Sequence, residues 1–215
     1  METSPSPCAC CTVGVPAAIR GAYLGCHVTL VDSARHLDSL PSVGLGDISA
    51  VLSGAALDRG RIRKLEHPDP RRPYGRHVFL EGAQVEGMVA TWTRAYPCAP
   101  HDHGGSVGGV RVLRGAALHR MYRLEGQTLS LAREERVATG GVVLCGPELI
   151  HSMQDAGDEE QLMTLHLYAS PIEEMRVYDL ASTTTYVVDG GCGAWVPVDE
   201  PKRIRRSWSG FARRM

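Results

Sequence analysis

Two histidines separated by one residue, His101 and His103, form the segment of this sequence best suited to chemistry. In an extended segment the side chains alternate between two faces, so both imidazoles point to the same side. Neutral imidazole is the commonest metal ligand in proteins, and a same-face pair can bind one ion of iron, zinc, copper or nickel. A glycine-rich run at 104–109 leaves room beside the pair. The segment therefore predicts a metal site.

A second polar group lies later in the chain, at Thr164, His166 and Tyr168. Read as a strand, this segment places the three side chains on one face and the apolar residues between them on the other. Three polar side chains are costly to bury unless they bond to one another. A relay would do this, with the Thr164 hydroxyl fixing the imidazole and the imidazole holding the phenol. A solvent-facing strand edge explains the same residue types.

The remaining histidines are less informative. His151 follows an apolar segment at 141–145 and the turn Gly146-Pro147. A lone histidine in such a place is usually a surface residue or a satisfied core residue, and this alternative stays open. Four others lie outside any motif and are interpreted as structural: His36, His67, His77 and His119.

Short strands are the elements that would position these residues. Apolar alternation broken by turn residues predicts strands at 77–80, 85–93, 108–113, 117–124, 128–132, 141–145, 161–168, 184–188 and 194–198. This pattern favours an antiparallel sandwich or barrel. Proline and charge clusters at 66–73 predict a loop.

Two short helices are expected before the strands, packed on one side of the main body. One follows Asp47 as its N-cap, and a second is expected at 33–40. The apolar face of the first is formed by Ile48, Val51, Leu52 and Ala55. Residues 1–30 show no clear period, apart from a short strand expected at 23–31.

The bulk composition fits a globular protein. We expect an irregular segment at 1–30, a single domain at 31–200 and a solvated basic tail at 201–215. The net charge of −1 gives no pull toward nucleic acid or an anionic membrane. Seven cysteines fit no disulfide framework, and no apolar run reaches membrane-spanning length. A monomer in the reducing cytoplasm is expected.

The histidine spacing resembles the cupin superfamily, in which His-x-His is followed by a Glu and then by a Gly. Here Gly108 stands at the Glu position and Gly115 closes the motif. The strand, Gly-Pro turn and His151 resemble the second cupin motif. The resemblance implies an all-β jelly-roll barrel, preceded here by the small helical segment, which would bring His151 to His101 and His103.

The missing carboxylate narrows the chemistry. Three neutral imidazoles leave the double charge of a divalent ion uncompensated, so an anionic and soft ligand such as a thiolate is the natural complement. Removing a large side chain at position 108 is also expected to open a coordination position.

Longer motifs resemble the cysteine dioxygenase family, from about Tyr74 to Tyr178. They are 101–106, 112–115, 164–171 and 175–179. The resemblance implies a non-haem iron(II) enzyme on a cupin barrel, with three site groups. The iron ligands would be His101, His103 and His151; the Ser-His-Tyr relay would be Thr164, His166 and Tyr168; and Tyr74 and Arg76 would bind the substrate, with Arg76 on its carboxylate.

Two positions separate this chain from its relatives. Animal members carry a cysteine at the Gly108 position, cross-linked to the relay tyrosine, so Tyr168 is expected to be an unmodified phenol. Mercaptopropionate dioxygenases typically have Gln at the Arg76 position, so Arg76 favours an amino-acid thiol. From the residues alone, Arg76 beside Arg71 and Arg72 would be interpreted as part of a solvated basic loop.

The expected function is oxidation of L-cysteine to cysteine sulfinate with dioxygen at iron(II), a step of cysteine, sulfinate and taurine metabolism. The partners would be a small thiol and dioxygen. Three alternatives stay open: oxidation of another small thiol acid such as 3-mercaptopropionate, a non-enzymatic sensor or ligand-binding cupin, and a zinc or manganese isomerase. The last would usually require the Glu that Gly108 replaces.

Overall fold

The computed structural model describes residues 30–54, 59–157 and 159–214. Within these ranges the helices are α2 (Leu30–Asp38), α3 (Leu45–Gly54), α4 (Arg59–Arg63) and the 3-10 helix η2 (Pro201–Arg203). The strands are β1 (Tyr74–Glu81), β2 (Glu86–Trp92), β3 (Val107–Arg114), β4 (Ala116–Glu125), β5 (Thr128–Ala138), β6 (Val142–Cys145), β7 (Ile150–Asp155), β8 (Met163–Ala169), β9 (Glu174–Asp179), β10 (Thr184–Asp189), β11 (Ile204–Ser209) and β12 (Ala212–Arg214). The all-β prediction is confirmed, because the helices only flank the strands. None of the described helices is long and apolar enough to cross a membrane.

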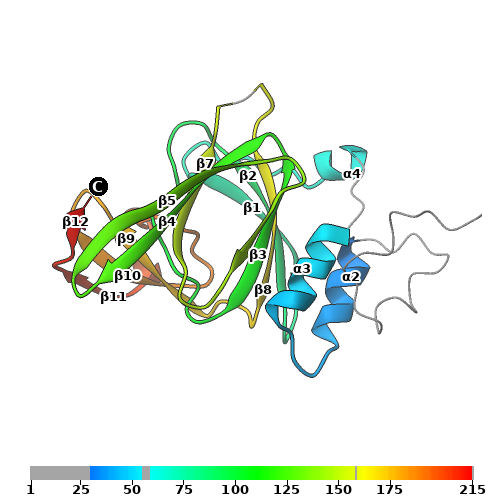
Figure 1. Ribbon diagram of the computed structural model, residues 1–215, viewed down its shortest axis with the longest axis horizontal. Helices are drawn as coiled ribbons and strands as arrows, with labels where there is room; N and C mark the ends of the chain where they lie inside the picture. The colour runs from blue at the N-terminus through cyan, green and yellow to red at the C-terminus, as the bar shows by residue number, and fades with distance from the viewer. Residues whose placement is uncertain (1–29, 55–58, 158, 215) are drawn as a thin grey trace, which may run out of the picture.

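The strands form three sheets. A five-stranded sheet has the order β1-β2-β8-β3-β6, a four-stranded sheet has the order β12-β5-β4-β7, and β11-β10-β9 form the third. The first two curve around a common interior, and the third lies at the end opposite the helices (Figure 1). The buried core between the sheets includes Val110 on β3, Ala117 on β4, Met153 on β7 and Tyr168 on β8. The barrel therefore encloses the polar segment at 164–168.

Strand β8 is buried along its whole length because it lies between β2 and β3. Its apolar residues Met163, Leu165 and Leu167 pack in the core cluster that includes the helices, while Tyr168 belongs to the cluster inside the barrel. The alternation predicted for this segment is therefore present. The alternative of a solvent-facing edge is wrong.

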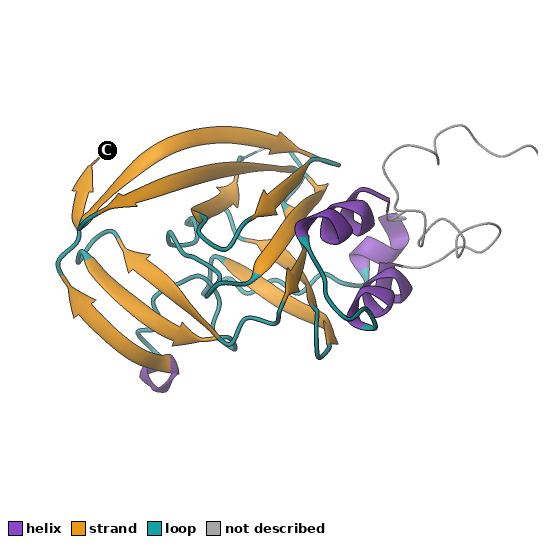
Figure 2. Ribbon diagram, turned by 60° about the horizontal axis from the view of Figure 1, so that its bottom comes forward, coloured by secondary structure: helices purple, strands orange, loops and turns teal. Residues whose placement is uncertain are grey.

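The helices lie outside the barrel (Figure 2), and α3 packs its apolar face on β3, β6 and β8 of the five-stranded sheet. The buried residues of this face are Ile48, Val51 and Leu52, as predicted, while Ala55 lies outside the described residues. The helix begins at Leu45, before the expected start. Asp47 is not the N-cap but lies in the first turn, where its carboxylate accepts the N–H of Gly44 at 2.9 Å, as in a capping box.

The other predicted boundaries differ in several places. The helix expected at 33–40 is α2, which begins and ends earlier, and 66–73 is a loop as expected. Strands β7 and β9 were not predicted, and 194–198 forms no strand. The segments expected at 1–30, including the strand at 23–31, lie outside the described residues, apart from positions 30 and 31, which begin α2.

The basic C-terminal segment is not a free tail. Strand β11 pairs with β10, and β12 pairs in parallel with β5. Phe211, between these two strands, is buried against Tyr178 with ring centroids 5.8 Å apart. The expected solvation holds for the side chains of β11, which are mostly exposed. The segment therefore closes one end of the sheets.

Candidate metal centre and its pocket

Backbone pairing brings two of the predicted ligands together. The N–H of His101 donates to the carbonyl of His151 at 2.9 Å, and the reverse bond measures 3.0 Å. On the other side, Asp102 N donates to Arg176 O on β9 at 3.1 Å, so this segment is held between β7 and β9. The Asp102 carboxylate also accepts the N–H of Arg176, at 2.9 Å. The Asp102 side chain is therefore directed to β9, while the imidazoles of His101 and His103 share the interior.

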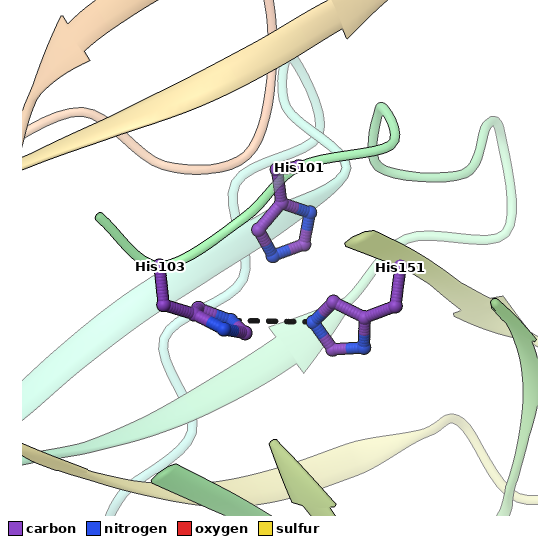
Figure 3. A group of neighbouring side chains, drawn as sticks. All are labelled: His101, His103 and His151. Carbon is purple, nitrogen blue, oxygen red and sulfur yellow. Dashed lines mark hydrogen bonds between the residues drawn. The ribbon is translucent and has the colours of Figure 1, made fainter. Parts of the chain in front are cut away.

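The three imidazoles of His101, His103 and His151 converge, as Figure 3 shows. One nitrogen from each ring lies within 4.8 Å of the others, and all three residues are buried. The Nε2 atoms of His103 and His151 face each other at 3.3 Å. Two nitrogens bound to one ion at about 2.0–2.1 Å each, in tetrahedral or octahedral geometry, would lie roughly 2.8–3.4 Å apart. The spacing therefore fits two ligands of a single metal ion.

Burial keeps these imidazoles neutral. It lowers the pKa of His101 to about 4 and the pKa values of His103 and His151 well below the ordinary value. The neighbouring imidazoles lower the pKa of His103 and His151 further, because each charged ring would repel the next. Neutral rings retain the lone pairs that a metal ion requires. The donor set therefore fits a divalent cation at neutral pH.

The second nitrogen of each ring has a different partner. His101 Nδ1 lies 3.0 Å from the carbonyl oxygen of Ala99, which can only accept, so Nδ1 carries the proton and Nε2 is free. His151 Nδ1 lies 2.9 Å from Nε2 of His119. His103 Nδ1 is buried without a hydrogen-bond partner among the described residues. His119 was interpreted as structural, but it lies directly behind a predicted ligand.

The expected relay bonds are present inside the barrel. Thr164 Oγ1 lies 2.7 Å from His166 Nε2, and His166 Nδ1 lies 2.9 Å from the hydroxyl of Tyr168. The Tyr168 ring lies beside a candidate ligand, with its centroid 5.0 Å from that of His103. Burial raises the pKa of Tyr168 well above its ordinary value, so the phenol is neutral.

Trp92 sets the direction of the relay. Its indole N–H, which can only donate, bonds to Thr164 Oγ1 at 2.8 Å. The Thr164 hydroxyl has no other acceptor among the described residues, so it donates to Nε2 of His166, whose Nδ1–H then donates to Tyr168. Burial lowers the pKa of His166 to about 3, which keeps the ring neutral. A neutral imidazole accepts a hydrogen bond at one nitrogen and donates one from the other. The O–H of Tyr168 is left to donate into the pocket.

Gly108 lies directly opposite Tyr168 on the neighbouring strand and opposite Cys145 on the other side. A Cβ atom at Gly108 would come within 2.4 Å of Cδ1 of the Tyr168 ring. The glycine therefore makes room for the phenol. The Tyr168 ring takes the space beside Gly108, and the open coordination position expected from this glycine stays a prediction.

Arg76 lies in the pocket rather than in a solvated loop. It lines a small cavity together with Tyr74, His101, His103 and Tyr168. Its Nη1 donates to the carbonyls at 190–192, at 3.0–3.3 Å, and its Nε lies 3.4 Å from the sulfur of Met88. Tyr74 is fixed beside it, since its hydroxyl oxygen accepts the N–H of Ala194 at 2.9 Å.

Glu86 is an additional charged residue of this pocket. Its Oε1 lies 3.1 Å from Nη2 of Arg76, and the two side chains are 13% and 18% exposed, so the pair is mostly buried. Burial raises the pKa of Glu86, and the neighbouring Arg76 opposes that shift. The cavity measures about 20 Å³, room for about one water molecule. A ligand larger than this must displace some of these contacts.

Sequence reasoning missed Glu86, Trp92 and His119. Each lies on the inward face of a strand that the alternation predicted, at 85–93 or 117–124. A polar side chain at an inward position requires a buried partner, and that was the available signal. The signal does not name the partner, because cross-strand neighbours depend on which strands pair.

The comparison with protein families agrees with this site. The family model of cysteine dioxygenase type I matches residues 62–181. A Klebsiella pneumoniae protein with a double-stranded β-helix domain has a TM-score of 0.46 at 16% identity over 54% of this chain and 87% of its own. The oxalate decarboxylase of Lactobacillus farciminis has a TM-score of 0.43 at 18% identity over 54% and 34%. The family match covers more than half of the chain and includes all three histidines, and it confirms the predicted cupin fold. This chain belongs to the cysteine dioxygenase type I family.

Proposed function

We propose that this protein is a thiol dioxygenase that adds both atoms of dioxygen to the sulfur of L-cysteine, forming cysteine sulfinate. The single observation that carries the proposal is the convergence of three buried, neutral imidazoles beside the Tyr168 phenol. His101, His103 and His151 would hold iron(II). When bound, iron supplies the redox chemistry with dioxygen that the side chains cannot perform.

The charge of the site favours a thiolate. Three neutral imidazoles contribute no negative charge, so a bound dication keeps its full charge within a buried environment. An anion that enters this environment is attracted strongly, because few dipoles are present to screen the interaction. The thiolate of the substrate supplies that anion, and its amine fits as a second donor.

Tyr168 would act as a hydrogen-bond donor. The chain of bonds from Trp92 through Thr164 and His166 leaves the phenol O–H directed to the pocket. A neutral donor held in one orientation stabilises negative charge that develops nearby without reorganisation. The substrate sulfur or the reacting oxygen atoms would receive this bond.

Arg76 would hold the substrate carboxylate. A guanidinium binds a carboxylate through paired N–H groups, and Arg76 lines the same cavity as His101 and His103. Its present partner Glu86 occupies one of these groups. A carboxylated thiol would therefore have to compete with Glu86.

This competition favours a second candidate substrate class, small thiols without a carboxylate. The ion pair between Arg76 and Glu86 makes that end of the pocket neutral overall. An aminothiol would place its ammonium beside Glu86 and would not require Arg76 to change partners. Small thiol acids such as 3-mercaptopropionate remain a further alternative.

We also propose that the protein acts as a monomer on a freely diffusing thiol in the cytoplasm, without nucleic acid or membrane partners. The buried cysteines Cys98, Cys145 and Cys192 are free thiols, which supports a reducing compartment. Light scattering of the purified protein tests the monomer.

The test combines metal analysis with oxygen uptake. Purified protein should contain close to one iron per chain and should consume oxygen with cysteine, giving the sulfinate by mass spectrometry. His103→Ala should lose both iron and activity, and Arg76→Ala should act mainly by raising KM for cysteine. Stoichiometric iron without oxygen uptake on cysteine, 3-mercaptopropionate, mercaptosuccinate or 2-aminoethanethiol would reject the thiol dioxygenase. Protein that binds no metal would favour the non-enzymatic cupin.

A further inference from the structure

We infer that His119 and Glu135 are positioning residues that hold His151 in the tautomer and orientation required of a metal ligand. The inference rests on the metal centre of the proposed function. It assigns a role to two side chains that touch neither the pocket nor the expected ion.

The sheet itself aligns the three side chains. His119 lies on β4, the strand between β5 and β7, directly opposite Glu135 on β5. On the other side it faces Met153, two residues along β7 from His151. Residues opposite one another share a face of the sheet, and diagonal neighbours on that face are within reach of long side chains. Strand pairing thus produces the row Glu135, His119, His151.

The hydrogen bonds of this row have a defined direction. Glu135 Oε1 lies 3.2 Å from His119 Nδ1, and a carboxylate can only accept, so His119 Nδ1 carries the proton. Nε2 of a neutral His119 is then an acceptor, and it lies 2.9 Å from His151 Nδ1. His151 must therefore carry its proton on Nδ1. This leaves the lone pair of its Nε2 directed at His103.

The opposite tautomer would abolish the site. If His151 carried its proton on Nε2, that N–H would point at the Nε2 of His103, 3.3 Å away, and could not bind an ion. Arg133 Nη2 lies 2.6 Å from Oε2 of Glu135, which helps to hold the carboxylate in place. Carboxylate–histidine support of this kind orients metal ligands and raises their basicity.

Only His151 has this side-chain support within the described part of the chain. His101 donates to the backbone carbonyl of Ala99, and His103 Nδ1 has no partner there. If His119 were only a satisfied core histidine, any buried polar group could be the partner of its Nε2. The partner is instead the ring of a candidate metal ligand, His151. His119 is 1% exposed and fills that specific place.

Metal affinity tests the inference without any thiol substrate. We would measure binding of Co²⁺ to the full chain in competition with a chelator. His119→Ala and Glu135→Ala should each weaken binding by about 10- to 100-fold. His119→Gln, whose side-chain carbonyl can replace the Nε2 acceptor, should weaken binding by less than about tenfold, the lower limit for loss of such a partner. Tyr122→Phe is the matched control, because it removes a hydrogen bond between β4 and β7, to Ser152, without touching His151.

A spectroscopic readout separates positioning from a purely structural role. In the Co²⁺ protein the imidazole N–H protons have hyperfine-shifted NMR signals, and the Nδ1–H of His151 should exchange slowly with solvent because His119 covers it. His119→Ala should accelerate the exchange of one such signal, and Tyr122→Phe should not.

The outcomes are distinguishable from those of the proposed function. Unchanged Co²⁺ affinity and unchanged N–H exchange in both alanine variants would overturn the positioning role, whatever the enzyme oxidises. If His119→Ala does not fold, Glu135→Ala, whose side chain is 30% exposed in the parent, and His119→Gln carry the test. If the alanine variants lose Co²⁺ affinity as expected but the parent protein oxidises no thiol, only the proposed activity is rejected.

Discussion

The ring of Tyr168 lies over Gly108, so that a Cβ atom at Gly108 would approach Cδ1 of the ring to 2.4 Å. The next residue, Gly109, has the same relationship on the other face of β3, where a Cβ would come within 2.6 Å of Leu52 on α3. Gly108 therefore leaves room for the Tyr168 ring inside the barrel, and Gly109 leaves room for α3 outside it.

Gly108→Ala should displace the Tyr168 ring. The added methyl group also meets the backbone carbonyl of Leu167 at 2.9 Å, which cannot move freely. We expect a loss of stability of about 1–3 kcal/mol, typical of overpacking, and a loss of oxygen uptake of at least about tenfold, since the hydrogen bond to His166 would be strained. Iron content should stay at the level of the parent protein.

Gly109→Ala is the matched control for this substitution. It crowds flexible side chains of α3 and should lower the melting temperature without lowering the activity per bound iron. Equal activity losses in the two variants would show that the packing of β3 matters, and not the position of the phenol.

Trp92→Phe should weaken catalysis without removing the relay. The indole N–H fixes the direction of the Thr164 hydroxyl, and its loss allows His166 to adopt the other tautomer. A single neutral hydrogen bond contributes about 0.5–1.5 kcal/mol, so kcat should fall by roughly 2- to 10-fold, with KM unchanged. Steady-state oxygen uptake measures both parameters.

The conservative series at Thr164 checks the same chain of bonds. Thr164→Ser retains the hydroxyl and should behave like the parent, while Thr164→Val should lose at least as much kcat as Trp92→Phe. A Thr164→Val enzyme of normal kcat would show that the relay does not orient Tyr168.

Alternation along single strands made part of the site predictable. It placed Thr164, His166 and Tyr168 on one face of β8, and it put His101 and His103 on one side of their segment. The burial of β8 was not predictable from its residues, because polar types suit an exposed edge as well as a satisfied interior. Its position between β2 and β3 decides between the two, and that position depends on the pairing of strands distant in sequence.

Cross-strand relations account for the residues that were missed. Glu86 opposes Tyr168 because β2 pairs with β8, and His119 lies between Glu135 and His151 because β4 is flanked by β5 and β7. The basic segment at 204–209 has little strand pattern, and its pairing with β10 supplies the structure. The sequence pattern predicts which residues share a face of one strand. These contacts depend in addition on the order of the strands in each sheet.

Glu86→Gln should improve the binding of carboxylated thiols. The amide has no charge, so Arg76 would be released from its present ion pair to bind a substrate carboxylate. We expect KM for cysteine and 3-mercaptopropionate to fall by about 3- to 10-fold, equivalent to roughly 0.7–1.4 kcal/mol, and KM for 2-aminoethanethiol to stay constant or rise. Oxygen uptake with the three thiols measures this pattern.

Glu81→Gln removes the same charge from the residue opposite Glu86 on β1 and serves as the control. A higher KM for both acids in Glu86→Gln would contradict the competition. It would mean that Glu86 holds Arg76 in its productive position.

The stability of the metal-free protein should decrease in acid, in part because of His166. Burial lowers the pKa of this imidazole to about 3, against an ordinary value of 6.5. Above pH 6.5 the ring is neutral in both the folded and the unfolded chain, so it does not affect the pH dependence. Between pH 6.5 and 3 only the unfolded chain takes up the proton, and each pH unit then costs about 1.4 kcal/mol of folding free energy.

His166→Gln removes this one proton uptake. In a chelator-containing buffer, the free energy of unfolding of the parent should fall more steeply than that of the variant, by about 1.4 kcal/mol per pH unit around pH 4–5. Denaturant titrations at several pH values give both slopes, and His36→Gln, on the exposed surface of α2, controls for the replacement of a histidine. Parallel slopes for the parent and His166→Gln would mean that His166 takes up a proton in the folded state. An imidazolium donates from both nitrogens, so in acid the Thr164 hydroxyl could then only accept, and the relay would keep its direction only at a pH at which the ring is neutral.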